Sequence, residues 1–200
     1  MLKSKKIKFL KISSELGAGT RGASKGFEGL KSAAVATGST LFNDHEIISI
    51  KDENDSLLKN INFPNAKRIQ SIYEVLNRVK KTVNHEVKQN HFPLLISGDH
   101  SISMGTIAGI KSAFPNKKIG VVWIDAHADI HTPFTTPSGN MHGMPIAASL
   151  GLDNFSCASN TPKKEVIELW NNIKTLGGND PNLEPKNIVY DGVRDTEWEE

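Results

Sequence analysis

Four residues that can bind metal ions follow two short apolar runs of the sequence. Asp125, His127 and Asp129 come directly after the run 119–124, and His100 follows an earlier apolar run. Strand side chains alternate with a period of two, so the three later residues would point to one side if the extended conformation continued. Carboxylates with imidazoles suit divalent first-row ions such as Mn2+, and the set contains no thiolate. The pattern predicts a metal site.

A buried polar network is the alternative explanation of the same residues. An aspartate can cap a following helix, and backbone groups can satisfy a buried histidine. That explanation is sufficient for any one of the four residues. For four such residues at the ends of two neighbouring strands, a metal site is the better explanation.

The elements that must position these residues alternate between strand and helix. The predicted strands are 7–12, 45–50, 94–96, 119–124 and 186–193, and the predicted helices are 23–37, 65–90, 101–114, 144–150 and one that starts at Thr161 or Pro162. Continuous apolar runs suit strands buried on both faces of a parallel sheet. The order therefore predicts an α/β fold, a three-layer parallel sheet with helices on both faces, whose ligands bind at the carboxyl ends of the strands.

Short polar residues mark where some helices should begin and end. Ser24 is the expected N-cap of the first helix, and Gly38 should end that helix. Ser101 can cap the helix that connects the two metal-bearing strands. Asp99 is expected to orient His100 from outside the metal shell, as metal-bound histidines usually require.

Three sequence motifs carry a resemblance to a known family. They read SGDHSISMG, DAHADIHTP and SGNMHGMP, in this order along the chain. Together they resemble the ureohydrolase family, which comprises arginases, agmatinases and formiminoglutamases, and they are most similar to the arginases. The resemblance begins near Gly17 and continues to the last residues. It implies the arginase/deacetylase-like α/β fold and a site that holds two Mn2+ ions.

The resemblance also assigns roles to the residues of the motifs. By motif match, His100, Asp125, His127 and Asp129 take metal-ligand positions, and Asp125 is the bridge between the two ions. His142 matches the family's proton-shuttling histidine. An imidazole suits that role because it titrates near neutral pH.

Substrate-binding positions follow from the same resemblance. Ser138 matches the hydroxyl that contacts the substrate α-carboxylate, and His131 stands where many arginases carry asparagine. Asp195 and then Glu197 match the acidic groups for the α-amino group. The alternative for Ser138 is a plain turn residue, and the alternative for Asp195 and Glu197 is a solvated acidic tail. The implied reaction is hydrolysis of the guanidinium group of L-arginine to ornithine and urea. Agmatine and formimino substrates are alternatives within the family.

A glycine-rich stretch offers a different function. Gly17, Gly19 and Gly22 fit the G-x-G-x-x-G pattern after a predicted strand, and Asp44 and Glu46 follow where a dinucleotide fingerprint has an acidic residue. This pattern keeps an NAD-binding domain as the least favoured alternative. The resemblance instead makes the stretch a turn near the active-site mouth.

Composition bounds the partners of the chain. The formal charge of +2 over 200 residues does not favour nucleic acid or membrane binding. No apolar run approaches the roughly 18 residues of a membrane span. Cys157 is the single cysteine, so no intramolecular disulfide forms and a cytoplasmic location is expected. The basic N-terminal stretch lacks the apolar region of a signal peptide.

The family pattern extends beyond the motifs found here. Ureohydrolases continue to a strand bearing D-x-D-x-x-D, which completes both metal sites, and no such pattern follows Val189. We expect residues 1–200 to form a single ureohydrolase-like domain that lacks the family's C-terminal third and has an unpaired sheet edge. A non-catalytic remnant that binds metal or a partner is the alternative to a hydrolase. A homo-oligomer, a trimer or hexamer as in the family, is expected of a complete chain.

Overall fold

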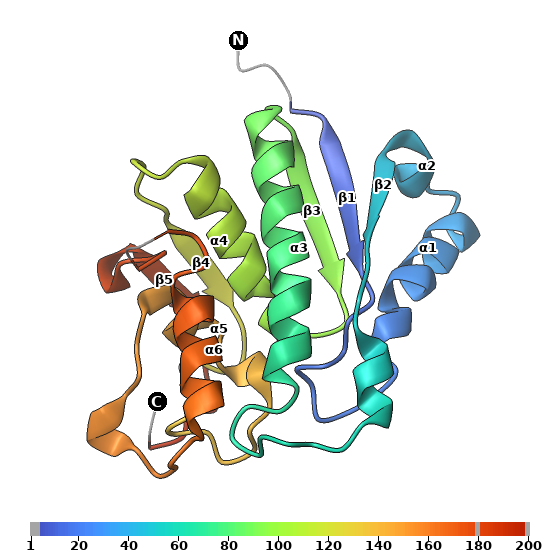
Figure 1. The fold of residues 1–200 in the computed structure, drawn as a ribbon. Coiled ribbons are helices and arrows are strands. Elements are labelled where there is room, and N and C mark those ends of the chain that lie inside the picture. The colour runs from blue at the N-terminus through green and yellow to red at the C-terminus, as the bar shows by residue number, and fades with distance from the viewer. Residues whose placement is uncertain (1–4, 179–180, 199–200) are drawn as a thin grey trace.

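The computed structural model describes residues 5–178 and 181–198. Strands and helices alternate along most of the chain (Figure 1). The strands are β1 (Ile7–Ile12), β2 (Glu46–Ile50), β3 (Phe92–Ser97), β4 (Val121–Ile124) and β5 (Ile188–Asp191). The α-helices are α1 (Gly26–Ala36), α2 (Leu41–Asp44), α3 (Ile69–Lys88), α4 (Ser103–Ala113), α5 (Pro145–Leu150) and α6 (Lys164–Lys174). The 3-10 turns are η1 (Ala23–Lys25), η2 (Asn54–Leu58), η3 (His100–Ile102), η4 (Met141–Gly143), η5 (Phe155–Cys157) and η6 (Pro185–Asn187).

All strand pairs of the described residues are parallel. β1 lies between β2 and β3 in a three-stranded sheet, and β4 pairs with β5 in a second sheet. This confirms the α/β fold with parallel strands, although the strands form two sheets instead of the expected single one. Within the described ranges, β3 and β4 each pair along one edge only.

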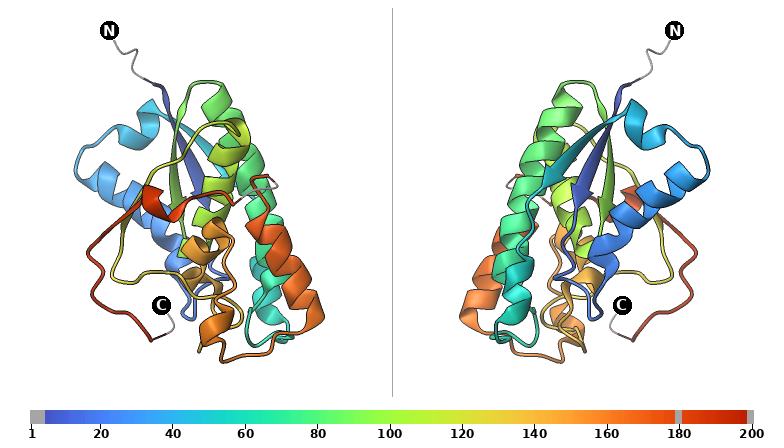
Figure 2. Two further views of the ribbon diagram at one scale, coloured as in Figure 1. Left: turned by 90° about the vertical axis from the view of Figure 1, so that its left-hand side faces the viewer. Right: turned by 90° about the vertical axis from the view of Figure 1, so that its right-hand side faces the viewer.

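Helices cover both faces of the three-stranded sheet, with α1 on one side and α3 on the other (Figure 2). Side chains of β1 point alternately to the two faces of the sheet and so contribute to both helix layers. Phe9 packs with Phe27 of α1 and Phe42 of α2, whereas Leu10 and Ile12 belong to the core that contains α3. The period of two in the strand therefore supplies one apolar cluster to each side.

Helix α3 is the central packing element of the core. Its buried apolar residues recur at one-, three- and four-residue steps along one face, and they are Ile69, Ile72, Val75, Leu76, Val79 and Val83. This stripe packs on the sheet and on α4. A Cβ atom at Gly109 of α4 would lie 2.7 Å from Cβ of Val83, so a glycine is required for the two helices to approach this closely.

Two predicted helix caps are wrong. The chain starts its first helical segment after Gly22, and Ser24 lies within the turn η1 and caps neither η1 nor α1. Asp99, and not Ser101, caps the turn that leads into α4, because its side chain accepts a hydrogen bond from the Ser101 N–H. The first helix does end before Gly38, whose φ of 73° is left-handed.

One face of the β4–β5 sheet is apolar and open to solvent. Val122, Ile124 and Val189 are 67%, 75% and 62% exposed, while Trp123 on the opposite face of β4 is buried. Val122 and Val189 are directly paired across the two strands, so these side chains form one continuous apolar surface.

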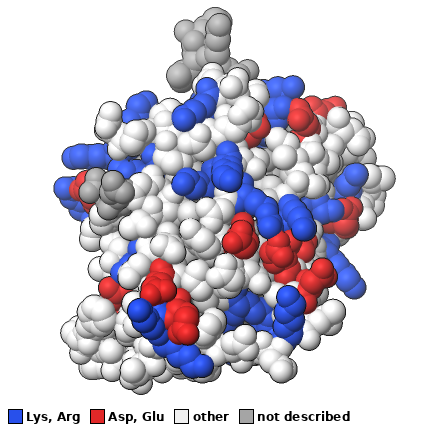
Figure 3. Space-filling view, in the orientation of Figure 1, with Lys and Arg blue, Asp and Glu red and all other residues white. Residues whose placement is uncertain are grey.

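Charged side chains are distributed without a dominant sign. On the face shown in Figure 3, basic and acidic side chains are interspersed. None of the helices in the described part of the chain is long and apolar enough to cross a membrane.

Candidate metal centre and its pocket

The carboxyl ends of β3 and β4 bring together three of the predicted ligands. His100 follows β3, and Asp125 and Asp129 follow β4. The Nδ1 atom of His100 lies 2.9 Å from Oδ2 of Asp125 and 2.9 Å from Oδ2 of Asp129. One ligand atom from each residue lies within 4.8 Å of the other two, so the three residues can bind one metal ion.

The backbone reaches this arrangement by a turn and not by strand alternation. β4 ends at Ile124, and Asp129 has a left-handed φ of 53°. The carbonyl of Asp129 accepts a hydrogen bond from Ile146 of α5 at 3.0 Å, which fixes the turn. The extended conformation on which the predicted alternation depends does not continue past β4, although Asp125 and Asp129 do converge. Aspartate is among the residues that tolerate this backbone conformation.

The donor set suits a cation. Oδ2 of Asp129 is buried and has no hydrogen-bond partner among the described residues, although Nδ1 of His100 lies 2.9 Å away. Buried carboxylate oxygens without partners are rare, and a cation would satisfy this one. The His100 ring also stacks on Trp123, with ring centroids 4.3 Å apart and planes at 14°. This stacking fixes the orientation of the imidazole.

The electrostatics of the three residues favour positive charge between them. Burial favours the neutral form of His100, but the carboxylates of Asp129 and Asp125 outweigh burial and raise the pKa of the imidazole. Burial also disfavours the charged form of Asp125, but the His127 N–H and the nearby His100 lower its pKa overall. A metal cation placed there would meet the same two carboxylates.

His127 lies beside this group and outside it. Its Nδ1 atom is 3.4 Å from Oδ1 of Asp125, and its Nε2 atom is 3.6 Å from Oδ2 of Asp195. Its side chain is 56% exposed. Asp125 therefore faces His100 with one oxygen and His127 with the other. The ligand role of His127 stays a prediction.

Asp99 has a different set of partners from the one expected. Its carboxylate accepts hydrogen bonds from the Gly17 N–H at 3.0 Å, from the Ser101 N–H at 2.8 Å and from the Ser101 hydroxyl. None of the hydrogen bonds of the described residues joins it to His100. Asp99 thus holds the loop on which His100 sits and acts on the imidazole only through the backbone.

A pocket of about 330 Å³ opens over the three converging residues. Apart from Asp99, every predicted site residue lines it. The lining residues are His100, Asp125, His127, Asp129, His131, Thr136, Pro137, Ser138, Asn140, His142, Gly143, Asp195 and Glu197. Residues from distant parts of the sequence, from His100 to Glu197, thus line one concave surface. Such a surface is the usual form of a small-molecule site.

The predicted substrate residues form one wall of this pocket. His131 is buried, with Nδ1 3.2 Å from the Thr135 hydroxyl and Nε2 3.2 Å from Oε2 of Glu197. Ser138 is exposed, and its hydroxyl accepts a hydrogen bond from the Asn140 N–H at 3.2 Å. These contacts place hydroxyl, imidazole and carboxylate groups side by side.

The loop that carries Ser138 is held from outside the pocket. A Cβ atom at Gly139, whose φ is 71°, would lie 1.6 Å from the carbonyl oxygen of Pro64, so only glycine fits. The Gly139 carbonyl accepts a hydrogen bond from the Lys67 N–H at 2.8 Å. Segments distant in the sequence therefore fix this wall.

His142 lies in the same pocket, on the turn η4. Its side chain is exposed, and its backbone N–H donates to the Gly17 carbonyl at 3.1 Å. The ring is thus presented to solvent and to the pocket from a fixed backbone position.

The glycine-rich stretch binds a carboxylate of the chain itself. Glu15 is buried, and its Oε2 atom accepts hydrogen bonds from the N–H groups of Gly22 at 2.8 Å and Ser24 at 2.9 Å. Burial opposes ionisation of Glu15, but these two N–H groups outweigh it and lower its pKa. Amides that would contact a phosphate in a dinucleotide site are therefore occupied by Glu15.

Sequence reasoning missed several residues of the site. Asn140 and Thr136 line the pocket, and Trp123 stacks on His100. The inward position of Trp123 could have been read from the alternation of β4. Glu15 gave no signal, because its partners are backbone groups.

Comparison with known proteins identifies the family. The model of the arginase family matches residues 5–200. The chain belongs to the arginase family. Over 145 residues it is 34% identical to the arginase of Bacillus caldovelox, an alignment that covers 72% of this chain and 40% of that arginase. Over 132 residues it is 39% identical to the arginase of Saccharomyces cerevisiae, covering 66% of this chain and 35% of that one.

Solved arginase structures agree with the fold. The structure of Entamoeba histolytica arginase in complex with L-ornithine matches with a TM-score of 0.75 and 27% identity, over 97% of this chain and 60% of that one. The Bacillus caldovelox arginase structure matches with a TM-score of 0.74 and 30% identity, over 97% of this chain and 60% of that one. The chain thus spans 40% or less of these curated arginases and about 60% of these solved arginase chains.

Proposed function

We propose that this chain carries the site of a manganese-dependent hydrolase that converts L-arginine to ornithine and urea. The observation that carries the proposal is the convergence of His100, Asp125 and Asp129 at the base of a pocket that also contains His142. Membership of the arginase family supports it. The ornithine-bound Entamoeba histolytica arginase supports it as well, because ornithine is the product of this reaction.

The metal-binding roles follow the geometry of the carboxylates. His100, Asp125 and Asp129 would hold one Mn2+ ion. Asp125 would bridge to a second ion beside His127, since its two oxygens face the two histidines. When bound, a pair of such ions activates a water molecule and stabilises negative charge in the transition state.

His142 is proposed to deliver a proton to the leaving amine. An amine leaves readily only when it is protonated, and an imidazole can donate near neutral pH. The exposed ring of His142 lies in the pocket, and the hydrogen bond to the Gly17 carbonyl fixes its backbone. It therefore has access both to solvent protons and to the pocket.

The two ends of the amino acid would contact different residues. Ser138 and His131 can donate hydrogen bonds to the α-carboxylate. Asp195 and Glu197 line the same pocket and would bind the α-amino group. Glu197 already lies 3.2 Å from His131, so substrate binding would bring the amino group close to an existing pair.

Two other functions compete with this proposal. An agmatinase-type enzyme would use the same metal residues on a substrate without the α-carboxylate. The second alternative is a chain that binds metal without catalysis. It is favoured because only three ligand groups converge among the described residues, which is enough for one ion. The wall formed by Ser138 and His131 favours L-arginine over agmatine, and His142 in the same pocket favours a catalytic role over metal binding alone.

The experiment is a urea-release assay with Mn2+, performed on the chain together with the C-terminal part of a related arginase that carries D-x-D-x-x-D. We expect L-arginine to be hydrolysed and agmatine to be a poor substrate. Ser138→Ala should raise KM for L-arginine and leave agmatine unaffected. His142→Ala should lower kcat by about 10²–10⁴-fold. Preference for agmatine would exclude the arginase assignment, and Mn2+ binding without any urea would favour the non-catalytic one.

A further inference from the structure

A small cavity lies at the start of α3, outside the candidate metal centre. Its volume is about 110 Å³, well above the roughly 10–15 Å³ that one water molecule requires. Arg68 and Lys59 line it together with Ser56, Asn60 and Asn62, and none of its lining residues is acidic. The cavity therefore combines basic and neutral polar groups.

Two of the residues that line this cavity each have a buried polar atom without a hydrogen-bond partner among the described residues. These atoms are Nε of Arg68 and the hydroxyl oxygen of Ser56. Among the described residues, Arg68 takes part in no salt bridge, whereas Arg78 of the same helix pairs with Glu53. Burial, together with the nearby positive charge of Arg21, lowers the pKa of Arg68. A buried guanidinium N–H without an acceptor is unfavourable unless a ligand supplies the acceptor.

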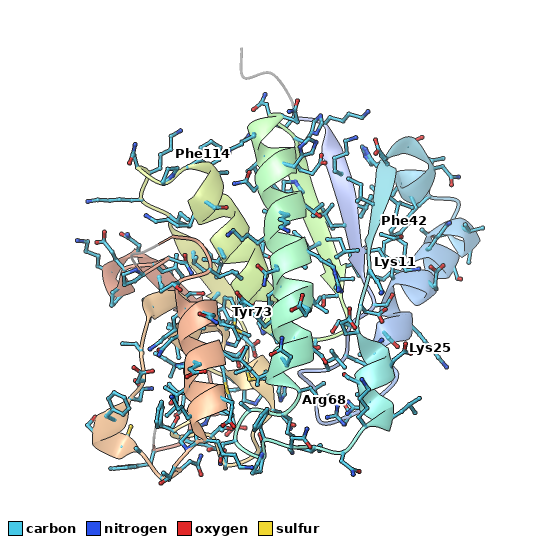
Figure 4. The ribbon with its side chains drawn as sticks, viewed as in Figure 1. Lys11, Lys25, Phe42, Arg68, Tyr73 and Phe114 are labelled. Carbon is cyan, nitrogen blue, oxygen red and sulfur yellow. The ribbon has the colours of Figure 1, made fainter. Side chains whose placement is uncertain are left out.

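The backbone of Arg68 is also unusual. Its φ of 57° and ψ of 25° are left-handed, a conformation that costs free energy in residues other than glycine. Arg68 is the N-cap of α3, and its side chain makes no capping hydrogen bond. Figure 4 shows Arg68 at the end of α3 where the helix begins. Arg68 therefore combines a strained backbone with a buried Nε atom that has no hydrogen-bond partner among the described residues.

We propose that this cavity binds a tetrahedral oxyanion of the phosphate class, with Arg68 as its main ligand. The Ser56 hydroxyl comes from η2 and the amides of Asn60 and Asn62 from the loop that follows it, so donors would approach the anion from more than one side. Lys59 adds a second positive charge. A tetrahedral anion offers four acceptor oxygens to such donors, and arginine recognises phosphate oxygens with two parallel N–H groups.

Arg68 is adjacent in the sequence to a residue that holds the wall of the metal-centre pocket in place. Lys67, adjacent to Arg68, donates its N–H to the Gly139 carbonyl at 2.8 Å. Anion binding would stabilise the segment that makes this contact.

Titration with inorganic phosphate by calorimetry, with thermal unfolding as a second readout, tests the proposal. Saturable binding is expected, with a rise in Tm of about 3–6 °C at ten times Kd. Arg68→Asn removes the guanidinium and keeps a residue that tolerates the left-handed backbone. It should weaken binding by at least about tenfold, and Ser56→Ala by about 2–10-fold. Arg68→Lys keeps the charge without the paired donors and should bind with intermediate affinity.

Lys25→Gln is the matched control, because it removes one positive charge from an exposed residue well away from Arg68 (Figure 4). Its phosphate affinity should equal that of the wild type. Phosphate also stabilises proteins by exclusion from their surface, but that effect does not saturate and would be the same in every variant. Absence of saturable binding, undiminished binding by Arg68→Asn, or equal affinity for acetate would each overturn the proposal.

Discussion

The Nδ1 atom of His100 lies 2.9 Å from the buried Oδ2 atom of Asp129, yet that oxygen has no hydrogen-bond partner. The two groups form an ion pair when the imidazole is protonated, and a metal ion between them would replace that pairing. Trp123 fixes the imidazole by stacking, and the left-handed backbone of Asp129 fixes the carboxylate. Such preorganisation by supporting contacts is what a metal site requires.

The first prediction concerns metal affinity. Asp129→Asn should weaken Mn2+ binding by at least about tenfold, because it removes a charged oxygen ligand from the three-residue group. Calorimetry on the purified chain measures the change. Asp195→Asn is the control, since Asp195 lines the same pocket but lies outside the group. Equal losses in the two variants would mean that general charge, and not coordination, attracts the ion.

The second prediction separates folding from metal binding. Asp99→Asn should lower the stability of the chain, because the carboxylate accepts from Gly17 and from Ser101. The loss should be about 1–3 kcal/mol, measured by urea unfolding. Mn2+ affinity should fall less than in Asp125→Asn, whose carboxylate is in the group. A larger loss of affinity in Asp99→Asn would make Asp99 a ligand.

The third prediction is a pH dependence caused by Glu15. Its pKa is lowered in the folded chain, so its contribution to stability is fully present above the unfolded pKa, about 4.3. It is lost as the pH falls through the lower, folded pKa. Glu15→Gln should therefore be less stable at pH 7 by about 1–3 kcal/mol, with a smaller difference from wild type below pH 4. Urea unfolding at several pH values measures both.

A difference that stays constant down to the acid limit would contradict this prediction. A constant difference would mean that the variant is less stable because glutamine fits the site poorly, and not because the negative charge of Glu15 is absent. Glu165→Gln is a suitable control, because Glu165 is exposed on α6 and its substitution should change stability little at any pH.

The fourth prediction concerns the apolar face of the β4–β5 sheet. The double variant Val122→Thr with Val189→Thr should reduce self-association and binding of an apolar dye, because it removes paired exposed valines. Threonine retains the preference for strands. Leu58→Thr is the control, since Leu58 is 91% exposed and lies on a different element, η2. Light scattering should show no change for that control.

The sequence predicts the elements well where a pattern repeats. The strand Ile7–Ile12 and the stripe of α3 follow from apolar periodicity, because one face of each must be buried. The motifs predict which residues meet at the pocket. Strand alternation does not explain how Asp129 reaches the site, because alternation holds only within a strand. β4 ends at Ile124, and the backbone of Asp129 is left-handed.

Other features depend on contacts that no local pattern encodes. Asp99 is the cap in place of Ser101, since its carboxylate, two positions earlier, accepts from the backbone N–H of Ser101. The role of the glycine-rich stretch depends on Glu15, whose partners are backbone amides seven and nine residues away. Because the N–H donors belong to the backbone, the residue types do not reveal them. The sequence therefore left open whether the stretch is a dinucleotide site or a turn near the active-site mouth.

The last prediction is that the 200-residue chain, assayed alone, releases urea from L-arginine at a negligible rate even with added Mn2+. His100, Asp125 and Asp129 can hold one ion, but near the second there would be Asp125, His127 and the exposed carboxylate of Asp195, which lies 3.6 Å from His127 and forms no three-residue ligand group with them. The His127 side chain is 56% exposed, so water competes for that ion. Misplacement by about 1 Å can cost on the order of 10²-fold in rate. Mn2+ binding measured on the same sample is the control for a folded site. Substantial turnover by the chain alone would show that another carboxylate completes the second site, and Asp195→Asn and Glu197→Gln would then identify it, Asp195 first because it lies beside His127.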